Sequence, residues 1–125
     1  MRPDTIICFE LKQDYIIDIP DQKEVNQAIE ELGSRKKHCV LFIESKYTTY
    51  SQDAIKNSLA PENFKYILAD ATVIRSLNQR LLADFYEKVM KPPVPSKYFE
   101  SEEEAVKWLL TFIKNKSSVK SSVKS

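Results

Sequence analysis

Histidine and cysteine, the residues most often used as catalytic bases, nucleophiles and zinc ligands, are scarce in this chain. Its single histidine, His38, stands beside Cys39, one of two cysteines, at the start of an apolar run. Nucleophilic catalysis needs a nucleophile with a base in hydrogen-bond reach, and a zinc site needs several Cys or His ligands at spacings such as CxxC. One His-Cys pair meets neither requirement. We therefore expect no metal site and no cofactor.

Other kinds of catalytic or phosphate-binding site are excluded by the residue pattern. Gly33 is the only glycine, whereas P-loop and dinucleotide-binding motifs need several. No serine stands in a GxSxG elbow. The acids Glu102–Glu104 follow Ser101, and this pattern is better explained by a capping box and the helix dipole than by paired catalytic carboxylates. The sequence therefore indicates a protein that is not an enzyme.

The candidate binding segment is a polar stretch that follows the apolar run Cys39–Ile43. Five apolar residues in succession predict a central, parallel strand, and binding sites in such sheets gather beyond the carboxyl ends of the strands. The residues of this segment are Tyr47, Thr48, Thr49, Tyr50 and Ser51. Its aromatic and hydroxyl side chains favour contact with a protein partner. Ser51 has a simpler interpretation as the N-cap of a helix over residues 52–59.

The elements that must position this segment follow from hydrophobic spacing and turn residues. Apolar runs at Ile6–Leu11 and Tyr15–Ile19 flank a turn at residues 12–14 and predict a hairpin. Asp21 then caps a helix that ends at Gly33 in a left-handed C-cap. A further strand is expected over Lys65–Ala71. The order of elements predicts an α/β layered domain over residues 1–115, with about four helices on a mostly parallel sheet of four or five strands.

A long amphipathic helix and a second, capped helix complete the domain. The apolar residues expected to face the sheet are Val73, Ile74, Leu77, Leu81, Leu82, Phe85 and Val89, and those expected opposite are Ser76, Gln79, Ala83 and Glu87. The prolines that follow stop this helix and lead into a short edge strand at Ser96–Phe99. Trp108 lies at the margin of the apolar stripe of the last helix. The basic tail at 116–125 is expected to be disordered, with a helical extension as the alternative.

A characteristic pattern of residues covers the region from Ser76 to Leu109. Its residues are Ser76, Arg80, Phe85, Tyr86, Lys91, Pro92, Pro93, Pro95, Phe99, Glu104, Ala105, Trp108 and Leu109. This pattern resembles the C-terminal half of small bacterial proteins labelled STAS-like, or STAS/SEC14 domain-containing. The resemblance implies a STAS-like fold, related in outline to lipid-binding CRAL-TRIO domains, and mostly structural roles for the motif residues.

The same resemblance bears on the candidate binding segment. In anti-sigma-factor antagonists of the STAS-like fold, a phosphorylatable Ser or Thr stands between the central strand and the next helix. The matching place here is Thr48–Ser51. The usual Asp-Ser-x-Gly signature is absent, because Glu44-Ser45-Lys46-Tyr47 contains no glycine. The departure weighs against a phosphorylation switch.

Two functions remain open at this stage. The first is a non-enzymatic STAS-like interaction or regulatory module that docks an unknown protein partner through the loop and helix around Tyr47 to Leu59; a homodimer is also left open. The second is a small-molecule or lipid binder with an apolar pocket between the sheet and the long helix, near Leu77, Leu81 and Phe85.

Charge and hydropathy limit the partners and the compartment. Nineteen Lys and Arg residues against 18 acids give no net attraction to nucleic acid. No apolar run approaches the roughly 18 residues of a membrane span, and the N-terminus lacks the apolar stretch of a signal peptide. We therefore expect a cytoplasmic protein that binds neither nucleic acid nor membrane.

Overall fold

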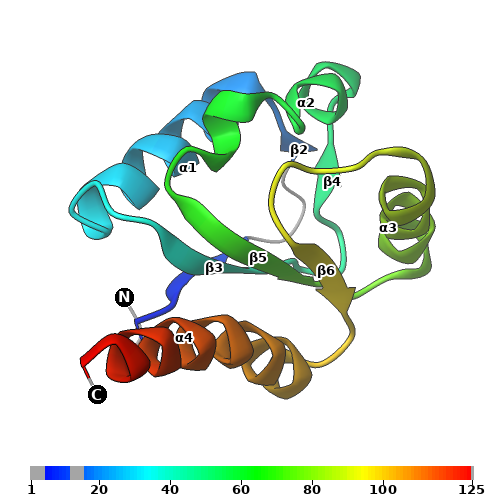
Figure 1. Ribbon diagram of the computed structural model, residues 1–125. Coiled ribbons are helices and arrows are strands. Elements are labelled where there is room, and N and C mark those ends of the chain that lie inside the picture. The colour runs from blue at the N-terminus through cyan, green and yellow to red at the C-terminus, as the bar shows by residue number, and fades with distance from the viewer. Residues whose placement is uncertain (1–4, 12–15, 125) are drawn as a thin grey trace.

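The structure is a computed structural model that describes residues 5–11 and 16–124, with side chains up to residue 113. Its strands are β1 (Ile7–Glu10), β2 (Ile16–Ile17), β3 (His38–Ile43), β4 (Thr49–Tyr50), β5 (Ile67–Val73) and β6 (Ser96–Phe99). Its helices are α1 (Ile19–Leu32), α2 (Gln52–Asn57), the 3-10 helix η1 (Pro61–Phe64), α3 (Leu77–Val89) and α4 (Glu102–Lys124). Figure 1 shows them as layers around one sheet.

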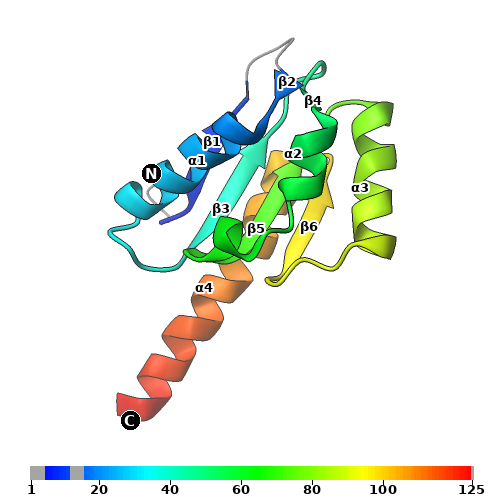
Figure 2. The ribbon, with the colours of Figure 1, turned by 90° about the horizontal axis from the view of Figure 1, so that it is seen from above.

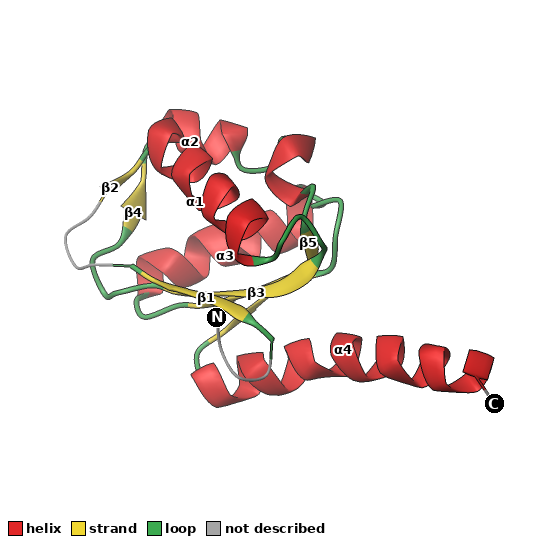
Figure 3. Ribbon diagram, turned by 90° about the vertical axis from the view of Figure 1, so that its left-hand side faces the viewer, coloured by secondary structure: helices red, strands yellow, loops and turns green. Residues whose placement is uncertain are grey.

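The main sheet has four parallel strands in the order β1-β3-β5-β6. Because successive strands are added in one direction, connections of the same hand all lie on the same face of the sheet. Accordingly α1, α2 and α3 cover one face, and α4 lies alone on the other (Figure 3). The predicted fold class, a layered α/β domain with four α-helices on a parallel sheet, is confirmed, as are the central position of β3 and the edge position of β6.

The two N-terminal strands of the predicted hairpin are both present, but their partners differ from that prediction. β1 pairs with β3, while β2 pairs with β4 in a separate two-stranded sheet. Ile6 and Ile7 are fully buried, and they point to opposite faces of the sheet. A strand buried on both faces needs helical layers on both sides, which a parallel crossover supplies. The predicted turn at residues 12–14 lies outside the described residues.

Side chains that alternate along the central strands form the cores of the two layers. Those that face α4 are Ile6, Cys39, Leu41, Ile43, Ala69, Ala71 and Val73, which pack with Ala105 and Leu109. On the other face, under α1, the buried side chains are Ile7, Val40 and Ile67, which pack with Ile29. The second core does not extend to α3, and a space remains between α3 and the sheet.

The ends of α1 differ from the prediction at both termini. The helix begins three residues early, because Asp18 is the N-cap and shares a reciprocal capping box with Asp21, while Pro20 occupies the first turn. Gly33 has φ of −89°, so it is not left-handed; Ser34 and Arg35 have positive φ instead. Gly33 is needed for space, because a Cβ there would lie 2.7 Å from Nδ1 of His38.

Helix α3 presents the opposite face to the one we expected. Val73 and Ile74 precede it, and Ser76 is its N-cap. Leu77, Leu81, Phe85 and Val89 are 73%, 59%, 47% and 64% exposed, whereas Gln79 and Ala83 are 6% and 1% exposed. The predicted burial is wrong for Leu77, Leu81, Phe85 and Val89, whereas Val73 and Ile74 are buried as predicted and Leu82 is half-buried. The physical reason is that the Gln79 amide is needed inside, where it bonds backbone groups, and that Ala83 is small enough to face the interior beside it.

Helix α4 agrees with its prediction over the described side chains. Ser101 accepts a hydrogen bond from the backbone N–H of Glu104 at 3.4 Å, as expected for the N-cap. Trp108 is half-buried, with its ring 5.8 Å from that of Phe99 and 4.9 Å from that of Phe112. Residues 116–124, where disorder was expected with helix as the alternative, continue α4 beyond the sheet (Figure 2). Within the described ranges, no helix combines the length and apolar character needed to cross a bilayer.

Candidate binding cavity

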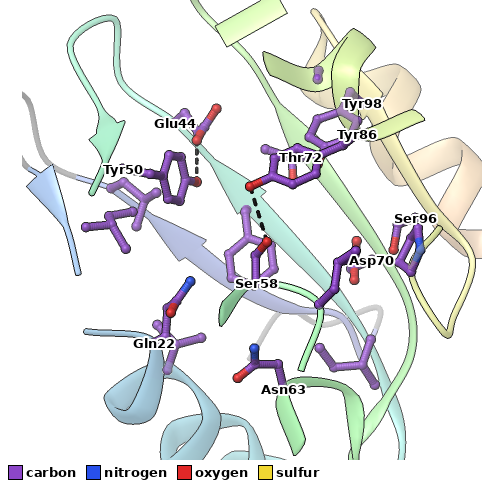
Figure 4. Close-up of a pocket in the computed structure, with 18 of the residues that line it drawn as sticks. Gln22, Glu44, Tyr50, Ser58, Asn63, Asp70, Thr72, Tyr86, Ser96 and Tyr98 are labelled. Carbon is purple, nitrogen blue, oxygen red and sulfur yellow. Dashed lines mark hydrogen bonds between the residues drawn. The ribbon is translucent and has the colours of Figure 1, made fainter. Parts of the chain in front are cut away.

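A cavity of about 460 Å³ lies between the sheet and the helices α1, α2 and α3. Figure 4 shows Glu44, Tyr50, Thr72 and Asp70 directed into it from different elements. Its apolar wall includes Ile17, Val25, Ile29, Phe42, Leu59, Phe64, Ile67 and Leu82. Its polar groups include Gln22, Glu44, Tyr50, Ser58, Asn63, Asp70, Thr72, Tyr86, Ser96 and Tyr98. A mostly apolar wall with a few convergent polar groups is the usual composition of a small-molecule site.

The floor of the cavity is polar because β5 and β6 present polar side chains at every second residue. Asp70 and Thr72 on β5 point away from α4, and so do Ser96 and Tyr98 on β6. Asp70 pairs with Ser96 in the parallel register, so these two side chains stand next to each other. A helix could not pack tightly on such a face without burying unpaired polar groups. There is therefore room for a ligand over β5 and β6, whereas α1 packs directly on the other half of this sheet face.

Asp70 is the deepest acid of the floor and is only 9% exposed. Burial raises the pKa of its carboxyl to about 7 from an ordinary 3.8, and the hydrogen bond with the Ser96 side chain offsets part of this effect. Near neutral pH the group is therefore divided between its charged and neutral forms. It can accept a proton or donate one in this range.

Glu44 forms the second buried acid, at the point where β3 ends. It is 4% exposed, and the hydroxyl of Tyr50 donates a hydrogen bond to its Oε2. Burial raises the pKa of Glu44 to about 7, while the Tyr50 hydrogen bond acts in the opposite direction. The same burial, together with the nearby Glu44 charge, raises the pKa of Tyr50, so this tyrosine stays protonated and remains a donor.

Two stacked tyrosines form the side of the cavity below α3. The rings of Tyr86 and Tyr98 are nearly parallel at 6°, with centroids 6.4 Å apart. Ser58 donates a hydrogen bond of 3.2 Å to the hydroxyl of Tyr86, and this contact ties α3 to the end of α2. Burial raises the pKa of both tyrosines. They therefore supply neutral aromatic faces and hydroxyl groups.

The frame around the cavity is held by side-chain amides that bond backbone groups. Gln79 donates to the carbonyls of Ser45 and Thr48 at 2.7 and 3.0 Å and accepts from the Arg75 N–H at 2.6 Å. Gln22 donates to the Ala54 carbonyl at 2.9 Å, which joins α1 to α2. Such satisfied networks fix the positions of the elements that carry them. The cavity is thus preformed in the absence of a ligand.

The predicted binding residues Tyr47–Ser51 are divided between different roles. Tyr47 is 52% exposed and Thr49 is exposed, so these two are available to a partner. Thr48 is 1% exposed and bonds the Ser45 hydroxyl at 2.8 Å, while Tyr50 lines the cavity. Ser51 caps α2 by accepting from the Ala54 N–H at 3.0 Å. The N-cap interpretation of Ser51 is therefore confirmed, and docking by the whole segment stays a prediction.

The motif residues from Ser76 onward lie mainly at structural positions. Ser76 caps α3, and Arg80 forms ion pairs with Asp84 at 3.7 Å and Glu100 at 4.0 Å. Phe99 and Trp108 pack together between β6 and α4. In the segment between α3 and β6, Lys91, Pro93 and Pro95 are exposed, and Pro92 lines the cavity. The structure therefore brings Tyr50, Tyr86 and Pro92 to one site, and the other predicted binding and motif residues do not line it.

Sequence reasoning missed the residues that make the cavity distinctive, chiefly Glu44, Asp70 and Tyr98. One signal was present for each acid. Asp70 interrupts the apolar run of a central strand, and Glu44 directly follows another such strand, at the carboxyl edge where sites gather. The alternation of Asp70 with Thr72 and of Ser96 with Tyr98 marks one polar sheet face.

The described residues offer no metal site, since no group of three or more His, Cys, Asp or Glu side chains among them is placed to hold an ion. In comparisons with known proteins, a family model described as a domain of unknown function (DUF7793) matches residues 1–113. Neither the curated proteins nor the solved structures gave a match.

Proposed function

Because the chain belongs to the DUF7793 family, a domain of unknown function, we propose its function from the cavity. The domain binds a small organic molecule between the sheet and helices α1, α2 and α3. One observation carries this proposal: the polar half of a sheet face, together with an apolar wall, lines a space of about 460 Å³ beneath the helices. The volume lies within the range of about 300–1,000 Å³ that is usual for ligand sites.

Binding without chemical transformation is the function that these side chains support best. A carboxyl with a pKa near 7 can act as a general acid or base. However, the described lining residues include no His, Cys or Lys that could add a nucleophile or a second proton-transfer group of another type. The sequence suggested a ligand pocket near Leu77, Leu81 and Phe85 as the alternative function. We now propose the pocket on the inner side of α3, where Leu82, Ala83 and Tyr86 line the cavity.

The experiment that tests this function is native mass spectrometry of the purified protein and of two variants. Ala83→Phe places a ring in the cavity, since Ala83 is 1% exposed and lines it. Leu81→Phe is the matched control, because it adds a ring at a position on the same helix that is 59% exposed. We expect an extra mass on the wild type and on Leu81→Phe that is absent from Ala83→Phe. Bare protein in all three, from several expression hosts, would contradict the proposal.

A second candidate, the STAS-like interaction module, is favoured by the outer face of α3. Leu77, Leu81, Phe85 and Val89 recur every fourth residue and are 47–73% exposed. Charges of both signs, Arg80, Asp84 and Lys88, follow along the edge of this stripe. A second copy of the chain offers the same stripe and the same mixed charges, so paired α3 helices would cover both. We propose this homodimer as the regulatory form of a cytoplasmic STAS-like protein.

Light scattering with size-exclusion chromatography tests the homodimer. Leu81→Glu with Phe85→Glu places two charges in the stripe and should convert a dimer to a monomer without loss of folding. Lys91→Glu, at an exposed position outside the stripe, is the matched control and should leave the mass unchanged. A wild-type monomer at about millimolar concentration, far above typical working dissociation constants, would contradict this candidate.

A further inference from the structure

The described lining of the cavity carries acids and no bases. Its acidic members are Glu10, Asp21, Glu24, Glu44, Asp70 and Glu87. No Lys, Arg or His is found among the described residues that line it. A ligand with a phosphate or carboxylate group would meet only like charge there. The cavity therefore selects against anions, including acidic lipids.

Two buried acids line the cavity at different levels of the sheet, since Glu44 directly follows β3 whereas Asp70 pairs with Val40 in the middle of that strand. Glu44 and Asp70 are 4% and 9% exposed, and both line the cavity. Each has a hydroxyl partner within the protein: Tyr50 donates to Glu44, and Asp70 is hydrogen-bonded with Ser96. A carboxylate offers about four acceptor sites, so these bonds leave capacity for further donors. Neutral hydroxyls do not balance a buried negative charge, whereas a bound cation does.

The rest of the cavity suits the organic part of such a ligand. Tyr50, Tyr86 and Tyr98 line it near the acids, and Phe42 and Phe64 belong to its wall. Aromatic faces attract cations and also pack against apolar groups. Thr72 and Ser96 add hydroxyl groups on the same sheet face. An inorganic cation would use none of this apolar surface.

We propose that the cavity takes an organic amine, with its protonated nitrogen at one of the two buried acids, Glu44 or Asp70, and its apolar or aromatic body against Phe42, Leu82 and Tyr86. This assignment rests on the proposed function, because it names the class of molecule that the cavity binds. When the amine binds, carboxyl groups that carry a proton near neutral pH give it up, since the cation favours their charged forms. Binding is therefore accompanied by release of protons to the solvent.

The test is a titration with three molecules that share one ring system and differ in head group: tryptamine, tryptophol and indole-3-acetate. Isothermal titration calorimetry near neutral pH, in buffers of different ionisation enthalpy, gives both affinity and proton release. We expect tryptamine to bind at least about tenfold more tightly than the other two, which corresponds to about 1.4 kcal/mol. Of the variants Asp70→Asn and Glu44→Gln, the one that removes the acid at the nitrogen should reduce this preference and the proton release. Glu103→Gln, on α4 at the other face of the sheet, should change neither.

The outcomes separate this assignment from the proposed function itself. Equal or tighter binding of tryptophol or indole-3-acetate, lost in Ala83→Phe, would overturn the amine assignment and leave the cavity as a binding site. Tryptamine binding that survives in both Asp70→Asn and Glu44→Gln would also overturn it. If none of the three binds, the amine assignment fails, while the mass experiment with Ala83→Phe still decides whether the cavity holds a molecule.

Discussion

Replacing Asp70 by Asn should remove a large part of the pH dependence of this protein's stability. In the unfolded chain the carboxyl has its ordinary pKa of 3.8, whereas burial raises the folded-state pKa to about 7. Below the lower value the group is protonated in both states and does not disfavour folding. Between the two values the unfolded chain ionises first, so the free energy of unfolding falls as pH rises. Above the higher value both states are charged and the loss is complete.

The size of the effect follows from the interval between the two pKa values. Each pH unit in the interval from 3.8 to about 7 is worth about 1.4 kcal/mol, which gives about 4 kcal/mol as an upper value. Glu44 contributes in the same direction, because its pKa is also raised, from 4.5 to about 7. A domain has only about 5–15 kcal/mol of stability in all. The wild type should therefore be clearly less stable in mildly alkaline than in mildly acidic solution.

The assay is urea unfolding at a series of pH values from about 3 to about 8, spanning the two pKa values that the linkage relation requires. Asparagine keeps the size of the side chain and an acceptor for Ser96 but cannot ionise. The stability of Asp70→Asn relative to wild type should rise steadily across this range, by about 2 to 4 kcal/mol at its alkaline end. Glu87→Gln, an exposed acid at the cavity rim, is the matched control and should keep the wild-type slope. Parallel curves for wild type and Asp70→Asn would refute the burial of a titrating carboxyl.

Three further substitutions test the framework by thermal or urea unfolding. Trp108→Ala removes ring contacts at 4.9 and 5.8 Å and should cost about 3 kcal/mol, so an unchanged melting temperature would show that the ring does not pack. Gln79→Ala removes the hydrogen bonds to the Ser45 and Thr48 carbonyls and from the Arg75 N–H and should cost about 1–3 kcal/mol, whereas Asn78→Ala on the exposed side should be neutral. Gly33→Ala places a Cβ 2.7 Å from His38 and should destabilise by about 1–3 kcal/mol; a neutral result would show that His38 moves freely.

The order and type of the main elements could be read from the sequence because local signals determine them. The unbroken apolar run of β3 requires helices on both faces, and the prolines after α3 require a break before β6. The two-residue strand β4 gave no such signal, and although a strand was predicted at the place of β2, its partner was not. The pairing of β2 with β4 joins segments that are distant in the chain. The sequence also did not reveal that β1 pairs with β3. Adjacency along the chain favours a hairpin between β1 and β2, and only the burial of β1 on both faces excludes that hairpin.

The orientation of α3 shows why the cavity could not be predicted. Periodicity identifies which face of a helix is apolar, but not whether that face is covered. Gln79 and Ala83 determine which face of α3 points inward. The Gln79 amide bonds the backbone of the loop before β4, and Ala83 is small enough to lie beside it. Both are tertiary effects. Asp70 and Glu44 then acquire their raised pKa values from burial alone, which depends on how far α3 stands from the sheet.

The most direct test of the central claim is carboxyl ¹³C NMR of Asp70 and Glu44 across a pH titration, with and without tryptamine. We expect midpoints near 7 in the free protein, because both groups are buried against the cavity. Saturating tryptamine should lower the midpoint of the acid at its nitrogen, since a bound cation favours the carboxylate. Midpoints near 4 in the free protein, the ordinary values of exposed acids, or two midpoints that both stay unchanged with the amine would contradict the claim.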